Sequence, residues 1–180
     1  MKKLLVFVGE GGSGKTTLIA ELVRRYPDKF KKVVTYTSRS LRVGEVDGVD
    51  YHFLPMEYFI NNKDLALVKK TNRGDYYGTR KADLYLDTHC PLLTLRFVGI
   101  SKLVKLGLNH VVVVYISITK ELKIARMRQR GDTEEMIRSR LELDAEDKVN
   151  ADWGRIIIPI LNLDAAETLD EKLKRILEAH

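Results

Sequence analysis

The chain has 180 residues, of which 44% are hydrophobic, enough material for one domain of ordinary size with a sizeable core. Lysine and arginine total 31 against 25 aspartates and glutamates, and the net charge of +6 suits a polyanionic ligand. The single cysteine, Cys90, excludes an internal disulfide framework, and we interpret it as a buried apolar side chain. No segment approaches the roughly 20 apolar residues of a membrane span, so we expect a cytoplasmic protein.

The N-terminal stretch combines three elements in a fixed order. Residues 4–8 form an apolar run that predicts a buried strand, because it is shorter than the apolar core of a secretory signal, about 7 to 15 residues. Residues 9–16 read G-E-G-G-S-G-K-T, and helical spacing of apolar residues follows as far as Tyr26, where Pro27 predicts the end of the helix. Strand, loop and helix together fit the nucleotide phosphate-binding pattern G-x-x-x-x-G-K-[ST].

This loop predicts an ATP site with Mg²⁺. Several backbone N–H groups must point at one polyphosphate, which glycine conformations allow, and the N-terminus of the helix adds partial positive charge. Lys15 is placed to reach the β and γ phosphates, and the Thr16 hydroxyl is placed to bind the metal ion. The residues expected at the nucleotide are Gly11, Gly12, Ser13, Gly14, Lys15, Thr16 and Thr17. The alternative is a glycine-rich turn without a ligand.

The next region carries the groups expected for a phosphorylated acceptor. A strand is predicted over residues 33–37, and residues 35–53 then read T-Y-T-S-R-S-L-R-V-G-E-V-D-G-V-D-Y-H-F. Arg39 and Arg42 place two planar guanidinium groups in one loop, suited to bidentate contact with a phosphate monoester. Tyr51 and Tyr77 can add hydroxyl donors. The alternative is a solvated basic loop with two core tyrosines.

Residues 35–53, together with G-D-Y-Y-G-T at residues 74–79, resemble the guanylate kinases. The signature of that family is two arginines three apart, then G-E-x-x-G-x-D-Y-x-F, then Y-Y-G-[ST], and the resemblance extends over nearly the whole chain. It implies ATP-dependent phosphoryl transfer to a nucleoside monophosphate, with GMP or dGMP as the first expectation. It also implies roles for Arg39 and Arg42 at the acceptor phosphate, Glu45 beside the arginines or ribose, and Thr35 and Thr79 near guanine O6.

The chain departs from the family pattern at two places. A helix is predicted over residues 56–67 and a buried strand over residues 90–97. Where the family tends to read L-D-x-D, this chain has Thr94 and Arg96, so the Walker-type aspartate and one base-reading carboxylate are missing. The family's other base-reading residue, a glutamate, is replaced by the apolar stretch at residues 66–68. We therefore expect Arg96 near the acceptor base and weak selectivity for guanine, or a preference for another monophosphate or a sugar phosphate.

Residues 119–148 are predicted to form a mobile lid. The β-branched run at residues 110–118 predicts a central parallel strand. Two arginine-rich helical stretches follow it, broken at Gly131, with Asp132 as the expected N-cap of the second. By resemblance the lid arginines are Arg126, Arg130 and Arg140, whereas Arg128 has no match. The alternative is a charged, solvent-facing pair of helices.

The C-terminal part predicts one more strand and one more helix. Pro159 suggests that the strand over residues 156–161 is at an edge or carries a bulge. Asn162 resembles the residue near the adenine of ATP. Thr168 and Glu171 form a capping box that opens a helix with its apolar residues on one face, namely Leu169, Leu173, Ile176 and Leu177.

Alternating strands and helices predict an α/β fold of the P-loop NTPase type, a parallel sheet between two helical layers. We expect one domain over residues 1–180, with a core at 1–32, 88–118 and 149–180, an α+β acceptor-binding insertion at 33–87 and the helical lid. Small nucleotides are the expected partners, rather than nucleic acid or a membrane, and the sequence leaves monomer and homodimer open. A non-catalytic binding module is the alternative from another class, and the intact Gly14-Lys15-Thr16 argues against it.

Overall fold

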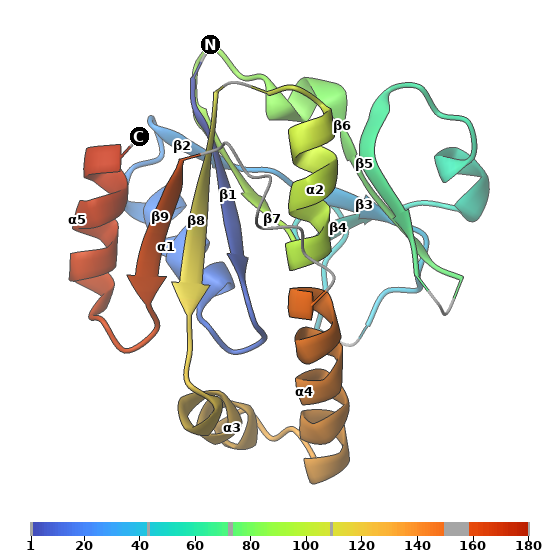
Figure 1. The fold of residues 1–180 in the computed structure, drawn as a ribbon. Coiled ribbons are helices and arrows are strands. Elements are labelled where there is room, and N and C mark those ends of the chain that lie inside the picture. The colour runs from blue at the N-terminus through green and yellow to red at the C-terminus, as the bar shows by residue number, and fades with distance from the viewer. Residues whose placement is uncertain (1, 43, 72–73, 109, 150–158, 180) are drawn as a thin grey trace.

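The computed structural model describes residues 2–42, 44–71, 74–108, 110–149 and 159–179. A five-stranded parallel sheet forms its centre, with strand order β2-β7-β1-β8-β9 (Figure 1). These strands are β1 (Leu4–Gly9), β2 (Phe30–Lys32), β7 (Cys90–Thr94), β8 (Val111–Ser117) and β9 (Ile160–Asp164). Both β1 and β8 therefore have neighbours on each side, as their uninterrupted apolar sequences predict.

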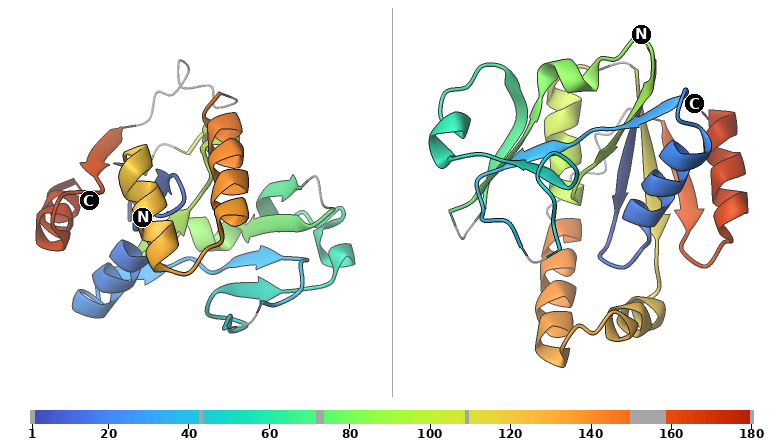
Figure 2. Two further views of the ribbon diagram at one scale, coloured as in Figure 1. Left: turned by 90° about the horizontal axis from the view of Figure 1, so that it is seen from below. Right: turned by 180° about the vertical axis from the view of Figure 1, so that it is seen from behind.

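Helices cover both faces of this sheet and give the three-layer fold predicted from the sequence. Helix α2 (Phe97–Lys105) lies on one face, and α1 (Lys15–Arg25) and α5 (Leu169–Ala179) lie on the other (Figures 1 and 2). Leu5 and Phe7 of β1 pack in the core with α1 and α5, whereas Val6 and Val8 pack in the core with α2. All four side chains have no exposed surface, so β1 is the centre of both cores.

A second sheet of four strands lies beside the first, away from α5 (Figure 1). Its strands are β4 (Tyr51–Phe53), β3 (Thr35–Thr37), β6 (Tyr76–Arg80) and β5 (Leu65–Lys70), in this spatial order. The short 3-10 helices η1 (Met56–Phe59) and η2 (Lys81–Leu84) flank it. Buried Ala66 packs in the core shared with α2, and Lys102 of α2 donates to the Val68 carbonyl at 2.5 Å. These contacts hold the small sheet against the main body.

Helices α3 (Lys120–Gln129) and α4 (Glu134–Val149) lie beyond the ends at which β1 and β8 finish (Figure 1). The chain turns between them at Gly131, whose φ of +88° is in the left-handed region that favours glycine. Thr133 caps α4, since its Oγ1 accepts a hydrogen bond from Met136 N at 3.3 Å. Asp132, the cap expected from the sequence, instead pairs with Arg130.

Three element predictions differ from the structure. The strand expected over residues 33–37 is confirmed only from Thr35 to Thr37, because residues 33–34 connect β2 of the main sheet to β3 of the small sheet. The helix expected over residues 56–67 is also wrong, because η1 ends at a turn in which Asn61 has φ of +59°, and β5 follows. The strand expected over residues 90–97 ends at Thr94, and α2 begins at Phe97.

The C-terminal predictions agree with the structure where it describes them. Residues 156–158 lie outside the described residues, but β9 follows Pro159 and is an edge strand of the sheet. The Thr168–Glu171 capping box forms in both directions, with Thr168 N to Glu171 Oε2 at 2.8 Å and Glu171 N to Thr168 Oγ1 at 3.3 Å. Cys90 is 2% exposed, and burial raises the pKa of its thiol to about 12, as expected for an inert side chain.

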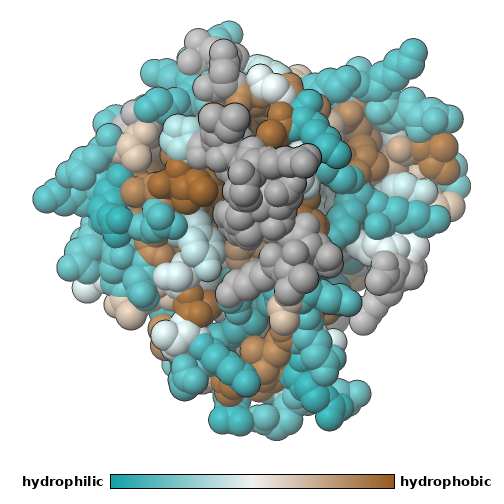
Figure 3. Space-filling model, in the orientation of Figure 1, coloured by the Kyte–Doolittle hydropathy of each residue, from teal (hydrophilic) through white to brown (hydrophobic). Residues whose placement is uncertain are grey.

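The exposed face in Figure 3 is largely hydrophilic, with hydrophobic side chains in separate areas rather than in one broad patch. Within the described ranges, no helix is both long enough and apolar enough to cross a bilayer.

Candidate functional site

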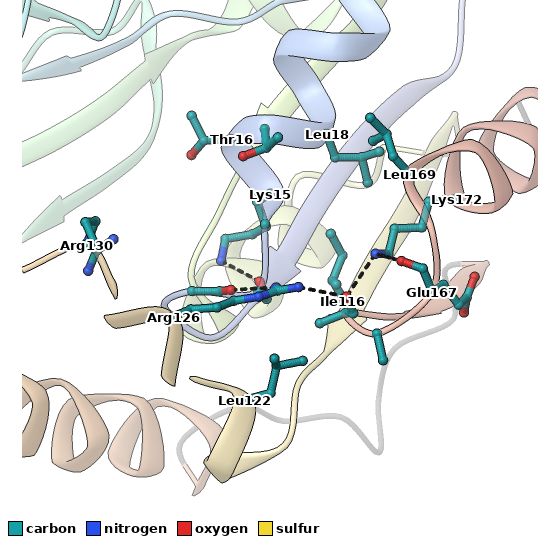
Figure 4. A pocket seen from close by; sticks show the side chains of 16 residues that line it. Lys15, Thr16, Leu18, Ile116, Leu122, Arg126, Arg130, Glu167, Leu169 and Lys172 are labelled. Atoms are coloured by element: carbon teal, nitrogen blue, oxygen red, sulfur yellow. Dashed lines mark hydrogen bonds between the residues drawn. The ribbon is translucent and has the colours of Figure 1, made fainter. Parts of the chain in front are cut away.

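A pocket of about 730 Å³ opens at the end of β1, beside the N-terminus of α1. Figure 4 shows side chains reaching it from the glycine-rich loop, from α3 and from the turn between β9 and α5. The lining residues are Gly12, Ser13, Gly14, Lys15, Thr16, Thr17, Leu18, Ile116, Leu122, Arg126, Arg130, Ala165, Ala166, Glu167, Leu169 and Lys172. The nucleotide residues predicted from residue 12 to residue 17 therefore share one cavity, and Gly11 adjoins it in the chain.

Two glycines of the loop are required by its geometry. A Cβ on Gly9 would lie 2.6 Å from the Ile116 carbonyl oxygen of the neighbouring strand, closer than real contacts allow. Gly14 precedes α1 with φ of +93°, a conformation that L side chains rarely adopt. The loop can therefore pass close to β8 and present the first N–H groups of α1, which is the arrangement that binds phosphate.

Lys15 is folded onto the loop. Its Nζ donates to the carbonyls of Gly9 at 2.7 Å and Glu10 at 2.8 Å, and to Ser13 Oγ at 3.2 Å. Burial lowers the pKa of the Lys15 ammonium to about 8, against the opposite effect of the charges on Asp144 and Glu10. The lysine is thus a weakly solvated cation held against the glycine-rich loop.

The pocket is strongly cationic, because Lys15, Arg126, Arg130 and Lys172 line it against the single carboxylate of Glu167. Arg126 spans it, donating to the carbonyls of Gly12 and Ala165, each at 3.0 Å (Figure 4). Burial also lowers the pKa of Lys172. Such a cavity favours a ligand with several negative charges.

The other residues predicted to contact the nucleotide or to form the lid have different partners and exposure. Arg130 pairs with Asp132, and Arg140 Nε lies 3.8 Å from the same carboxylate. Arg128, which had no predicted role, pairs with Glu134 in a largely exposed salt bridge. Asn162 is exposed on β9 and is not among the pocket-lining residues, so its role near adenine stays a prediction.

A second cluster forms in the small sheet around Arg39. Its Nη1 and Nη2 donate to the two oxygens of Glu45 at 2.6 and 2.5 Å, and its Nε donates to Tyr77 Oη at 3.1 Å. The guanidinium also lies over the Tyr51 ring, 5.0 Å from its centroid. The Arg39 hydrogen bond lowers the pKa of the Glu45 carboxyl to about 2. Four predicted acceptor residues therefore make one connected group.

Arg39 and Arg42 differ in what they offer a ligand. Glu45 accepts from both terminal nitrogens of Arg39, so most of the fork is engaged within the protein. Arg42 is exposed, and its backbone N–H donates to Glu45 Oε2 at 2.9 Å. Thr79 is 2% exposed on β6, and Thr35 is partly buried on β3. The side chain of Arg42 is therefore the more accessible of the two guanidinium groups.

The positions that depart from the family pattern lie where the two sheets approach each other. Leu67 has φ of +55° at an irregularity in the β5–β6 pairing, and the next residue, Val68, accepts from Lys102. Arg96 is exposed at the N-terminus of α2 and donates to the Leu143 carbonyl of α4 at 3.4 Å. Thr94 is exposed at the end of β7. Apolar and cationic groups thus stand where the resemblance led us to look for carboxylates.

Sequence reasoning missed an ionic contact at the loop. Lys123 of α3 is 1% exposed and pairs with both Glu10 and Asp144. These residues are far apart in the chain, so no spacing relates them. The sequence carried one signal for this contact: Lys123 lies next to the apolar Leu122 in a helix whose apolar residues form only a weakly defined face.

The family model and the curated relatives agree on one family. The family model "Guanylate kinase" matches residues 1–180. Guanylate kinases of Carboxydothermus hydrogenoformans and Chlorobaculum tepidum are 32% and 31% identical to this chain, each over 98% of it and over 87% and 92% of their own lengths. A crystal structure of guanylate kinase from Anaplasma phagocytophilum matches 99% of this chain and covers 84% of its own, with a TM-score of 0.64 at 20% identity. A gluconokinase from Sinorhizobium meliloti matches at a TM-score of 0.54 and 15% identity, over 98% of this chain and 90% of its own. Both structural likenesses bear on the fold alone.

Proposed function

This chain belongs to the guanylate kinase family and is a phosphotransferase, and we propose that it transfers the γ-phosphoryl group of ATP to a nucleoside monophosphate, GMP or dGMP. The observation that carries the proposal is the pairing of a cationic pocket at the glycine-rich loop with the Arg39–Glu45–Tyr77 group in the adjoining sheet. One site suits a polyphosphate donor, and the other suits a phosphate monoester.

The donor side is proposed to bind ATP with Mg²⁺. The loop N–H groups and Lys15 hold the phosphates, and Arg126 closes the pocket from α3. Thr16 lines the pocket with an exposed hydroxyl, which fits an ion that keeps most of its waters and arrives with the nucleotide phosphates. Bound there, Mg²⁺ neutralises charge on the β and γ phosphates.

The acceptor side is proposed to bind the phosphate of the monophosphate through Arg42, Tyr77 and Arg39. Glu45 and the Tyr51 ring fix the plane of the Arg39 guanidinium. Arg39 therefore orients Tyr77 Oη more than it binds a ligand through its own terminal nitrogens. Arg42 supplies the exposed charge.

Phosphoryl transfer needs alignment and charge stabilisation more than a general base. Lys15 and the arginines of α3 and α4 provide charge beside the transferring group, and the small sheet provides alignment. We propose Lys15, Arg39, Arg126, Arg130 and Arg140 as the catalytic group, acting with the metal ion.

Another acceptor is the second candidate, favoured by one observation. The apolar stretch at residues 66–68 and Arg96 occupy the positions at which the resemblance predicts carboxylates for guanine, so another nucleoside monophosphate or a sugar phosphate remains a candidate acceptor. A pure binding module is disfavoured because Lys15, Thr16 and the arginines of the pocket are all present.

A coupled assay of ATP consumption over a panel of monophosphates tests the proposal. We expect turnover with GMP and dGMP above that with AMP, UMP or a sugar phosphate. Lys15→Met removes the charge at the γ-phosphate and should lower the rate at least about a hundredfold, or about 3 kcal/mol of transition-state stabilisation. A Lys15→Met chain that keeps more than half of the wild-type rate would contradict the enzymatic role, and exposed Lys31→Met serves as the matched control.

A further inference from the structure

Lys123 joins three segments at the glycine-rich loop. Its side chain is 1% exposed, and its Nζ lies 2.8 Å from Glu10 Oε2 and 2.6 Å from Asp144 Oδ2. Glu10 belongs to the loop, Lys123 to α3 and Asp144 to α4. Because a lysine is almost never fully buried without compensating charge, these carboxylates fix where both helices sit over the loop.

Asp144 also accepts a hydrogen bond from the backbone of the loop. The Gly11 backbone N–H donates to Asp144 Oδ2 at 3.0 Å, so the same oxygen accepts from Gly11 and from Lys123. A Cβ on Gly11 would lie 3.1 Å from Met127 Cε of α3 and 3.6 Å from Asp144 Oδ2 of α4. Both helices therefore lie directly on this part of the loop. The Asp144 carboxylate occupies the Gly11 backbone N–H, a donor of the kind that binds phosphate.

The charge of Asp144 also acts on Lys15. Among nearby charges it is the largest influence that raises the pKa of that lysine. Since the lysine of such a loop reaches the β and γ phosphates, the carboxylate lies at the end of the loop that receives the terminal phosphate. Two anions cannot share one donor and one cation without strong repulsion in a weakly solvated site.

We propose that Asp144 is an internal competitor of the terminal phosphate of the bound nucleotide, held at Gly11 by Lys123 until that phosphate displaces it. The inference rests on the proposed function and adds a positioning residue to it. ATP must displace the carboxylate, whereas ADP, which lacks the terminal phosphate, does not. Asp144 therefore lowers the affinity for ATP relative to ADP.

Asp144→Asn tests this inference because it removes the charge and keeps the shape. Calorimetric titration with ADP and with a non-hydrolysable ATP analogue should show the Kd of the ATP analogue falling about fivefold or more, while the Kd of ADP changes less than about twofold. Glu142→Gln removes an exposed carboxylate from the same helix and should leave both values unchanged.

A second measurement needs no nucleotide. Hydrogen exchange at the Gly11 amide should be slow in the wild-type chain and faster in Asp144→Ala, since the alanine removes the acceptor. Circular dichroism confirms that both variants are folded.

The outcomes separate this inference from the proposed function. A gain confined to the ATP analogue supports competition by Asp144. Equal changes for the two nucleotides, or weaker binding of the ATP analogue alone, would overturn it and indicate a merely structural contact. A wild-type chain that binds neither nucleotide would overturn the proposed function, and this inference with it.

Discussion

At the scale of single residues, the loop lysine is a group whose charge depends on its surroundings. Lys15 is surrounded by loop carbonyls and by three charged side chains, of which Asp144 and Glu10 raise its pKa and Lys123 lowers it. Burial outweighs the two carboxylates, so its pKa is about 8, below the ordinary value of 10.5 for a lysine. The lysine is protonated at neutral pH and loses its charge within the range of a binding experiment.

The affinity for ATP should therefore depend on pH. Below about pH 8 the protonated Lys15 pairs with the phosphates, and above it the neutral amine does not, so affinity falls as pH rises through about 8. One coupled proton limits the slope to about tenfold per pH unit. Titrations between neutral and alkaline pH measure it, and buffers of different ionisation heat report the proton taken up on binding.

Lys15→Arg is the control for that pH dependence, because arginine keeps its charge throughout the range. The Kd of this variant for ATP should change little between neutral and alkaline pH. A wild-type affinity that is flat across pH 8 would contradict a lowered pKa.

The two arginines proposed at the acceptor should have separable roles. Arg42 is exposed, whereas Arg39 is 9% exposed and bound to Glu45 and Tyr77. Arg42→Ala should weaken use of the acceptor by about 1.5 to 3 kcal/mol, the contribution of a charge-assisted hydrogen bond, without changing the melting temperature. Steady-state kinetics with each substrate varied in turn would measure this as a higher acceptor KM at an unchanged ATP KM.

Arg39→Ala should affect the acceptor and also lower the melting temperature, because it leaves Glu45 without its salt-bridge partner and removes the contact with the Tyr51 ring. Exposed Lys63→Ala in the same region is the matched control. Equal losses for ATP and the acceptor in Arg42→Ala would instead indicate general damage, and no loss would support a solvated basic loop.

At the scale of helices and strands, the sequence predicted the elements whose signals are local. The runs at residues 4–8 and 110–118 are apolar at every or nearly every position, and α1 and α5 carry clear boundary signals, so all four agree with the structure. The small sheet is held by non-local pairing. Leu65 and Ala66 are both buried, and Leu67 is left-handed, so β5 lacks the alternation by which a strand is recognised.

The capping box of α5 is such a local signal and has a measurable energy. Thr168 Oγ1 accepts from Glu171 N, satisfying one of the unpaired N–H groups at the start of the helix. Thr168→Ala should lower the free energy of unfolding by about 1 kcal/mol, measured by urea denaturation. Thr168→Ser keeps the oxygen and should lose much less; equal losses in the two variants would show that the methyl contact rather than the cap is responsible.

At the scale of the whole molecule, the sequence predicted which segments should bind phosphate but not how these segments contact one another. The motifs identified the loop, the Arg39 group and the arginines of α3 and α4. The contact of α3 and α4 with the loop depends on Lys123 and Asp144, which meet only in three dimensions. Single charged residues on helices are usually solvated, so nothing local distinguished these two.

We expect selectivity for the acceptor base to arise between parts as well, where α2 meets β5 of the small sheet on one side and α4 on the other. Val68 is bonded to Lys102, and Arg96 to the Leu143 carbonyl. A guanidinium has donors only and cannot accept from N1–H or the exocyclic amine of guanine. Carboxylates there would contribute about 1.5 to 3 kcal/mol each, so losing both removes about two to four decades of discrimination.

We therefore expect weak selectivity for GMP over IMP, which lacks only the exocyclic amine, or a preference for another acceptor. The ratio of kcat/KM for GMP and IMP measures it, and a ratio above about 10⁴ would contradict the expectation, since such rejection requires a site built to pair the missing group. Arg96→Asp supplies an acceptor at the start of α2, where aspartate is also a favourable cap. This variant should raise the ratio, whereas Lys105→Asp at the other end of the same helix should not. If neither changes a ratio that is already high, another carboxylate, Glu45 or Asp75, must read the base.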